Sequence, residues 1–275
     1  MSLTPQLIEA AVDRYLREID RYEKLSKFIG EACRILLEEN NIRGSVQWRA
    51  KDPERLRKKL EKYLISGEHA DEFTDLDSVF RVLKDLARAR VTTYVDTDRA
   101  RVIALVQERF SGFAVGSQVV ADVKDEPLGF YRATHCMVRL KDEEAIGQYR
   151  NLKLLGCELQ VCSYLAHVYH ELEHDVRYKP LAGLLTKKQN DLLNALARHM
   201  EVGNTIANLL SSELEEAEKV RVERVARRLS GAAKSEAHFR DNPFLKVVAG
   251  SPLLLRLVDL IQSNRPHREL PETPA

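Results

Sequence analysis

The sequence predicts an α+β fold: a mixed sheet of five strands, flanked by helices and bracketed by a long helix at each end. Two observations lead to this fold class. Several short segments alternate apolar and polar residues, which is the pattern of a strand with one buried face. Both ends of the chain instead carry long runs with apolar residues at helical spacing, up to about Asn40 and again after Lys187.

The composition bounds the class of protein. The chain has 275 residues, of which 44% are hydrophobic, and a net charge of +1. This apolar content is ample for a buried core, and the charge excludes a wholly basic nucleic-acid binder while allowing local basic patches. The four cysteines form no CxxC pair and lie in apolar or strand-like segments, so we expect buried free thiols. The sequence shows no signal-peptide apolar region and no apolar run of membrane-spanning length, which predicts a cytoplasmic protein.

The first predicted helix begins at Thr4 and Pro5, a capping residue followed by proline at the first helical position. Alternation and turn residues divide the middle of the chain. The elements predicted there are, in chain order, a strand over 42–51, a helix over 54–64, a helical turn over 78–86, a strand over 88–95, a helix over 96–110 and strands over 113–123, 134–140 and 157–162.

The last third of the chain changes character after Lys179 and Pro180. A nearly continuous helix is predicted over 187–229, followed by a short helix over 251–261 and a disordered tail from Pro266. We therefore divide the chain into an N-terminal helical segment over 1–44, a core over 45–180 and a C-terminal helical extension over 181–275.

Phosphate-binding loops of the common glycine-rich types are absent from the sequence, so any phosphate must be held by side chains. Arg49 and Lys51 point to the same side of a strand, and Lys59 lies about two turns into the basic helix that follows. Such a cluster can grip a triphosphate through charge-assisted hydrogen bonds. A solvated basic helix face accounts for the same residues.

Two carboxylates are candidates for catalysis or for metal binding. Asp85 stands just before a strand, and Glu158 lies on the polar face of another strand, beside a core. Mg²⁺ commonly binds through one or two carboxylates together with substrate phosphates, so this pair predicts a magnesium site. Glu158 also suits a general base. An ordinary cap or surface role explains Asp85 equally well.

Aromatic and histidine residues complete the candidate groups. The aromatic pair after Gly129, Phe130 and Tyr131, stands at the mouth of a strand, where such a ring either stacks on a base or packs into the core. His167, His170 and His174 share one helix face. Their span of about 10 Å is too long for one zinc ion, which favours histidines that line a pocket.

Taken together and in this order, these pieces resemble the RelA/SpoT-type alarmone synthetase domain, particularly its small single-domain members. The resemblance covers about Val46 to Lys179. The matching residues are Arg49, Lys51 and Lys59, then Asp85 and Arg90, then the run from Tyr131 to His135, then Glu158-Leu159-Gln160, and finally Glu173-His174 with Tyr178-Lys179.

The resemblance implies an enzyme that transfers pyrophosphate from ATP to the ribose 3′-hydroxyl of GDP or GTP, making (p)ppGpp. It also implies a role for each matching residue. Those that would contact ATP are Arg49, Lys51, Lys59 and Arg90. Asp85 and Glu158 would hold Mg²⁺, with Glu158 as base for the 3′-hydroxyl, and the acceptor nucleotide would lie against Tyr131, His135 and Gln160.

Four departures from the family pattern leave the acceptor open. Arg55 replaces a serine, Arg88 replaces glycine or alanine, and Cys162 replaces an arginine, while the loop over 127–131 lacks the usual lysine and is one residue shorter.

One alternative is a toxin-type enzyme that modifies an adenine nucleotide or the 3′ end of tRNA. The basic run Arg221, Arg224, Arg227 and Arg228 motivates it, although a solvated helix face also explains that run. Another alternative is a nucleotide-binding protein without catalysis. A homo-oligomer is left open.

Overall fold

The computed structural model describes residues 3–114, 116–125, 130, 132–178 and 186–233. The chain forms two compact units, Met1–Ser211 and Ser212–Ala275. The first unit contains the sheet and its helices, and the second is described only through the C-terminal part of one long helix. The helix predicted over 251–261 and the tail from Pro266 lie outside the described residues.

Helices and strands follow the predicted order over most of the chain. The helices are α1 (Pro5–Glu39), α2 (Pro53–Ser66), α3 (Leu76–Val82), α4 (Asp98–Arg109), α5 (Tyr164–Tyr178) and α6 (Lys187–Ala233), with a 3₁₀ helix, η1 (Gly147–Leu152). The strands are β1 (Gly44–Ala50), β2 (Ala87–Thr93), β3 (Ser111–Gly112), β4 (Ala121–Asp125), β5 (Arg132–Arg139) and β6 (Cys157–Ser163). The predicted α+β class is confirmed.

The sheet is mixed, as predicted, but it has six strands among the described residues rather than five. Its order is β1-β2-β6-β5-β3, with β4 paired to the other end of β5. The central strands β2 and β6 run parallel, and every other pair is antiparallel. The parallel pair places residues from two distant parts of the sequence side by side.

The strand predicted over 113–123 is wrong for most of its length. Its apolar and polar residues alternate, but the backbone turns sharply after Gly112. The N–H of Gly112 donates to the carbonyl of Ser117 at 2.9 Å, and the N–H of Ser117 donates to that of Ala114 at 3.1 Å. Gly116 has a φ of 75°, a conformation that breaks a strand. Pairing with β5 resumes only at Ala121.

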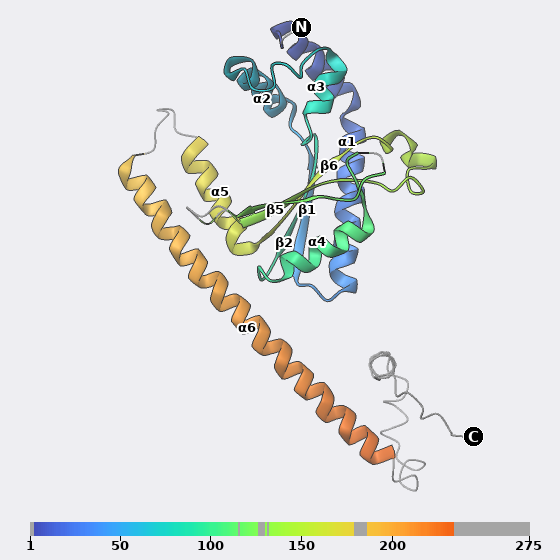
Figure 1. Ribbon diagram of the computed structural model, residues 1–275, viewed down its shortest axis with the longest axis vertical. Coiled ribbons are helices and arrows are strands. Elements are labelled where there is room, and N and C mark those ends of the chain that lie inside the picture. Colours follow the sequence, from blue (N-terminus) through green and yellow to red (C-terminus); the bar gives the residue numbers. More distant parts are fainter. Residues whose placement is uncertain (1–2, 115, 126–129, 131, 179–185, 234–275) are drawn as a thin grey trace, which may run out of the picture. The chain divides into compact units, whose positions relative to one another are not determined.

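Helix α1 begins as predicted, because the hydroxyl of Thr4 accepts a hydrogen bond from the N–H of Leu7 at 3.2 Å. The helix lies along one face of the sheet (Figure 1), and its apolar residues pack into the core there. The residues of this helix that are wholly or almost wholly buried include Ile8, Ala11, Val12, Tyr15, Leu25 and Ile29. The contact is close: a Cβ added to Gly30 would lie 2.3 Å from the ring of Trp48 on β1.

The register of the strands gives the sheet two different faces. Trp48, Ala89, Leu159 and Cys136 lie opposite one another across β1, β2, β6 and β5, on the face covered by α1. Because side chains alternate along a strand, the neighbouring residues form a polar row on the other face. Tertiary packing thus leaves one face of the sheet for the main hydrophobic core, while the other face carries these polar rows and a smaller apolar cluster that includes Ala133 and Cys162.

A second, smaller hydrophobic cluster lies beneath α5 and the first part of α6. Its buried members are Phe130, Ala133, Cys162, Ala166, Tyr169 and Ala197. Burial raises the pKa of the Cys162 thiol to about 11, so this residue is an apolar filler. All four cysteines are free and buried, as predicted. Among the described residues, no helix combines the length and apolarity needed to cross a membrane.

Candidate functional site

Four strands contribute polar side chains to one face of the sheet, in two adjacent rows. Arg49, Arg88 and Glu158 form the first row, across β1, β2 and β6. The second row contains Gln47, Arg90, Gln160 and His135, across β1, β2, β6 and β5. Residues predicted separately from distant parts of the sequence therefore meet on this face.

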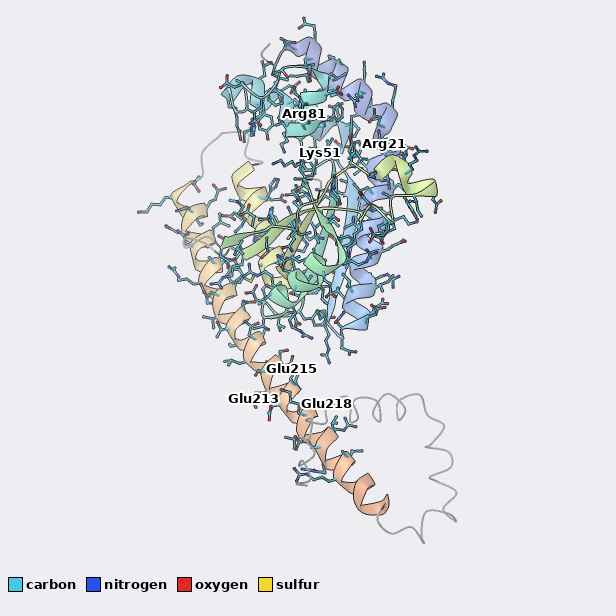
Figure 2. The ribbon with its side chains drawn as sticks, turned by 45° about the vertical axis from the view of Figure 1, so that its right-hand side comes forward. Arg21, Lys51, Arg81, Glu213, Glu215 and Glu218 are labelled. Carbon is cyan, nitrogen blue, oxygen red and sulfur yellow. The ribbon has the colours of Figure 1, made fainter. Side chains whose placement is uncertain are left out.

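The backbone of Lys51 is fixed from the core side. The Tyr15 hydroxyl, on α1, donates to the carbonyl of Lys51 at 2.7 Å, and the N–H of Lys51 donates to the carbonyl of Leu86 at 2.8 Å. Lys51 lies where β1 leads into α2 (Figure 2). These two hydrogen bonds hold Lys51 beside Asp85, the residue before Leu86.

Asp85 is the centre of a compact ion-pair cluster. Its carboxylate lies 2.6 Å from Nζ of Lys51 and 3.0 Å from Nζ of Lys59, and its side chain is 12% exposed. Burial raises the pKa of Asp85, but the two lysines more than offset this and bring it to about 2. Asp85 is therefore a fixed negative charge at neutral pH.

Glu158 is held at both carboxylate oxygens. Nε of Arg88 donates to Oε2 at 2.8 Å, Nη2 of Arg88 forms an ion pair with the same oxygen at 2.6 Å, and Nδ1 of His135 lies 3.1 Å from Oε1. Burial raises the pKa of Glu158, but the hydrogen bond from His135 and the charge of Arg88 lower it to about 2. The glutamate is thus ionised and oriented by two partners.

Arg88 joins the two carboxylates. Its Nη2 atom, 2.6 Å from Glu158, also lies 3.7 Å from Oδ2 of Asp85. A magnesium ion shared by Asp85 and Glu158 needs oxygen ligands at about 2.0–2.1 Å in octahedral geometry. Instead, a guanidinium contacts both carboxylates, and the described residues contain no group of three or more side chains arranged as metal ligands. These side chains, as placed, do not fit an ion held between the two carboxylates.

Arg90 connects the sheet to α5. Its guanidinium donates to Oε1 of Gln160 at 3.3 Å, to Nδ1 of His167 at 2.8 Å and to Oε1 of Glu171 at 2.9 Å. The partners on α5, His167 and Glu171, are four residues apart and so share one helix face. Arg90 is therefore positioned from two elements at once.

Positive charge dominates this face. The cations are Arg49, Lys51, Lys59, Arg88 and Arg90, and the acidic residues within the two rows and their ion pairs are Asp85, Glu158 and the more exposed Glu171. Burial lowers the pKa of Arg49, and the like charges of Arg88, Arg55 and Arg90 lower it further. Cations that repel one another on a partly buried surface favour a polyanionic ligand.

The structure gathers most of the predicted site residues on one face. Those brought together are Arg49, Lys51, Lys59, Asp85, Arg90, His135, Glu158 and Gln160. Tyr131 and the loop over 127–129 lie outside the described residues. Phe130, next to them, is fully buried and packs edge-on against Tyr169 with ring centroids 6.0 Å apart, so this aromatic belongs to the core.

Sequence reasoning noted Arg88 only as a departure and missed its pairing with Glu158. It also missed Glu171 as a partner of Arg90. A usable signal existed, because Arg88 and Arg90 alternate on one strand as Glu158 and Gln160 alternate on another. Only the register between those strands, however, shows which arginine faces which acidic or amide group.

His170 makes the stability of this region sensitive to mild acid. Its Nε2 accepts a hydrogen bond from the N–H of Arg132 at 3.2 Å, and burial followed by the charge of Arg90 lowers the pKa of His170 to about 4. An unfolded histidine titrates near pH 6.5, at about its ordinary value. The stability due to neutral His170 is therefore complete above pH 6.5 and is lost as the pH falls from 6.5 towards 4.

We expect the free energy of unfolding, measured with urea at pH 7, 6, 5 and 4, to fall by up to about 3 kcal/mol through this residue. His170→Gln should reduce the pH dependence of the free energy of unfolding by the contribution of one proton. An amide oxygen can still accept the hydrogen bond from the N–H of Arg132, but it does not titrate. His174→Gln, at an exposed position of the same helix, is the matched control and should keep the slope. An unchanged slope in His170→Gln would contradict the assignment.

Comparisons with known proteins bear on the fold. No protein-family model matches the sequence, and no curated protein matches it either. Among solved structures, small alarmone synthetase 1 from Bacillus subtilis aligns with a TM-score of 0.57 at 18% identity, covering 74% of this chain and 99% of its own. A GTP pyrophosphokinase family protein from Streptococcus pneumoniae aligns with a TM-score of 0.53 at 18% identity, covering 76% of this chain and 95% of its own.

The Bacillus subtilis protein has also been solved bound to AMPCPP and bound to its product pppGpp, and both structures align with this chain at TM-scores above 0.5. Small alarmone synthetase 2 from the same organism aligns with a TM-score of 0.52 at 19% identity, covering 72% of this chain and 98% of its own. The chain therefore has the fold of the small alarmone synthetases, as the order of its motifs predicts.

Proposed function

We propose that the protein is a pyrophosphokinase that transfers pyrophosphate from ATP to the ribose 3′-hydroxyl of GDP or GTP. One observation carries the proposal: five cations and two ionised carboxylates share a single polar face of the sheet, and three of the cations contact those carboxylates directly. Phosphoryl-type transfer asks for positioning and charge neutralisation rather than for a protein nucleophile, and this face supplies both. The likeness to a synthetase that binds AMPCPP and pppGpp supports the same choice of ligands.

In this proposal the acceptor oxygen attacks the β-phosphorus of ATP. The bond between that phosphorus and the oxygen bridging to the α-phosphate breaks, AMP leaves, and the proton of the 3′-hydroxyl passes to Glu158. Lys51 and Lys59 hold the phosphates from the end of β1 and from α2, while Arg49 and Arg90 hold them or the adenosine from the sheet. ATP enters as its magnesium complex, so Mg²⁺ arrives with the substrate.

Glu158 becomes a better base when the substrates are bound. With a pKa of about 2, the carboxylate is too weak a base at neutral pH to accept a proton efficiently. Bound phosphates bring several negative charges beside it and compete for Arg88, and both effects raise its pKa. Proton transfer is therefore coupled to filling of the nucleotide site.

The acceptor side is defined by His135 and Gln160. Both lie in the second polar row, and both contact Oε1 of Glu158, His135 at 3.1 Å and Gln160 at 3.4 Å. An acceptor ribose bound against them would place its 3′-hydroxyl beside Glu158. Tyr131 is retained as the proposed stacking residue for the acceptor base.

An acceptor other than a guanine nucleotide is the second candidate, because the acceptor loop departs from the family pattern. The basic run on α6 gives tRNA little support, since Arg221 lies 3.6 Å from Glu218 and Arg227 lies 3.3 Å from Glu223 on the same helix. Exposed pairs of this kind are typical of a solvated helix face.

The experiment is a product screen with γ-labelled ATP, Mg²⁺ and one acceptor at a time: GDP, GTP, AMP, ADP or bulk tRNA. We expect label to move to GDP or GTP with one AMP released per transfer, and we expect transfer by Glu158→Gln to be slower by about 10²-fold or more. Transfer only to an adenine nucleotide or to tRNA would keep the chemistry and change the acceptor. Absence of transfer to every acceptor would contradict the proposal and would favour a nucleotide-binding protein without catalysis.

A further inference from the structure

The polar face holds an arginine, Arg88, at a position where the family pattern has glycine or alanine beside the carboxylates expected to hold Mg²⁺. Arg88 stands on β2 opposite Glu158 on the parallel strand β6, and both side chains are largely buried, 26% and 15% exposed. Arg88 pairs side-on with Oε2 of Glu158 through Nε and Nη2. The same Nη2 atom reaches the Asp85 carboxylate at 3.7 Å.

The neighbourhood of Asp85 works against a metal ion in the same way. Lys51 and Lys59 lie at 2.6 and 3.0 Å from its two oxygens. A divalent cation on Asp85 would have to displace or lie beside three positive groups. The negative charge of both carboxylates is already compensated by the protein's own cations.

We propose that Arg88 takes the place of a divalent cation between Asp85 and Glu158, so that the protein binds nucleotide phosphates with a guanidinium there and holds no metal ion on these carboxylates. A guanidinium has five N–H donors in a rigid fork. The hydrogen bond to Glu158 uses the Nε donor, and Nη2 lies against both carboxylates, which leaves the Nη1 donors for phosphate oxygens. Arginines in this role stabilise charge on a transferred phosphoryl group.

The proposal has two parts that can fail separately. Exclusion of the cation depends on the contacts that Arg88 and the two lysines make with the carboxylates, and none of these contacts involves nucleotide. The contact with phosphates rests on the proposed function. An experiment without nucleotide therefore tests the first part even if the chain transfers no pyrophosphate.

The first test titrates Mn²⁺ into the full chain without nucleotide and follows free Mn²⁺ by electron paramagnetic resonance. We expect Arg88→Ala to bind Mn²⁺ at least tenfold more tightly than the wild type, and Arg88→Ala combined with Asp85→Asn to lose that gain. Arg88→Lys keeps the charge, so it should exclude Mn²⁺ as the wild type does; it also guards against a folding defect of the alanine variant. Equal binding by wild type and Arg88→Ala would overturn the proposal.

Arg109→Ala is the matched control. Arg109 makes a two-pronged pair with Glu144, at 2.6 and 2.7 Å, away from the polar face. Its removal likewise deletes an arginine paired with a glutamate, but that glutamate lies outside the two polar rows. We expect its Mn²⁺ binding to equal that of the wild type, and a gain as large as that of Arg88→Ala would overturn the proposal.

The second test measures the dissociation constant of AMPCPP by calorimetry, in EDTA and in Mg²⁺. For the wild type we expect the two values to agree within threefold. For Arg88→Ala we expect binding at least tenfold weaker in EDTA, with recovery in Mg²⁺. If the wild type bound AMPCPP tenfold more weakly in EDTA than in Mg²⁺, as is expected for Arg88→Ala, the phosphate contact would be overturned. Absence of AMPCPP binding by the wild type in both buffers would count against this contact and the proposed function, while the Mn²⁺ titration still decides the exclusion.

Discussion

Glu158→Gln should lower the rate of pyrophosphate transfer by about 10²–10⁴-fold, the usual contribution of a positioned general base. The amide keeps the shape of the carboxylate but cannot take the proton of the 3′-hydroxyl. It also loses the charge that pairs with Arg88 at 2.6 Å. The check is the turnover rate at saturating ATP and acceptor, together with the dissociation constant of AMPCPP, which should change far less than the rate.

Glu144→Gln is the control for this variant. Glu144 pairs with Arg109 through two hydrogen bonds and Glu158 pairs with Arg88, but Glu144 lies outside the polar rows. Its turnover rate should stay within about threefold of the wild type. A Glu158→Gln protein with a wild-type rate, or one that loses AMPCPP binding as strongly as turnover, would show that Glu158 is not the base.

Lys51→Ala should weaken binding of AMPCPP by about 10- to 100-fold, which corresponds to loss of one charge-assisted hydrogen bond. It should also lower the free energy of unfolding by about 1–3 kcal/mol. Lys51 is the more buried lysine beside Asp85, at 15% exposed, and its removal leaves that carboxylate with only Lys59 at 3.0 Å and Arg88 at 3.7 Å. Calorimetry and urea unfolding measure the two effects.

The double variant Lys51→Ala with Asp85→Asn separates the two effects. It should recover part of the lost stability, because the buried carboxylate that lacks its lysine is gone, although the 30% exposed Lys59 also loses its pair with Asp85. It should not recover full AMPCPP affinity. Lys58→Ala, an exposed lysine on α2, should change stability by less than about 0.5 kcal/mol and affinity by less than threefold. Wild-type affinity in Lys51→Ala would mean that Lys51 serves only the ion pair.

The fold was predictable wherever local pattern and tertiary packing agree. Thr4 caps α1, alternation marks β1, β2, β5 and β6, and helical spacing marks α6, as expected. The failure at 113–123 has a local cause that alternation does not report. Gly112 and Gly116 permit a turn that tightens the chain between Gly112 and Ser117.

The site was predictable as a set of residue types but not as a set of contacts. Asp85 was expected to bind a metal ion, and Lys51 and Lys59 were expected to bind phosphates. The structure instead pairs Asp85 with both lysines. Cys162 was a reason to doubt the site, yet its thiol fills the second hydrophobic cluster. Burial and ion pairing depend on neighbours that lie far away in sequence.

The sequence by itself determined the α+β class, the order of most elements and the residue types on the polar strand faces, because these follow from periodicity and motif spacing within short segments. Only the tertiary structure decided that Arg88 faces Glu158. Those residues are 70 positions apart, and their contact depends on the parallel register of β2 and β6. A shift of one residue in that register would turn one of the two side chains to the core face, so the pairing is set by how the whole sheet packs against α1.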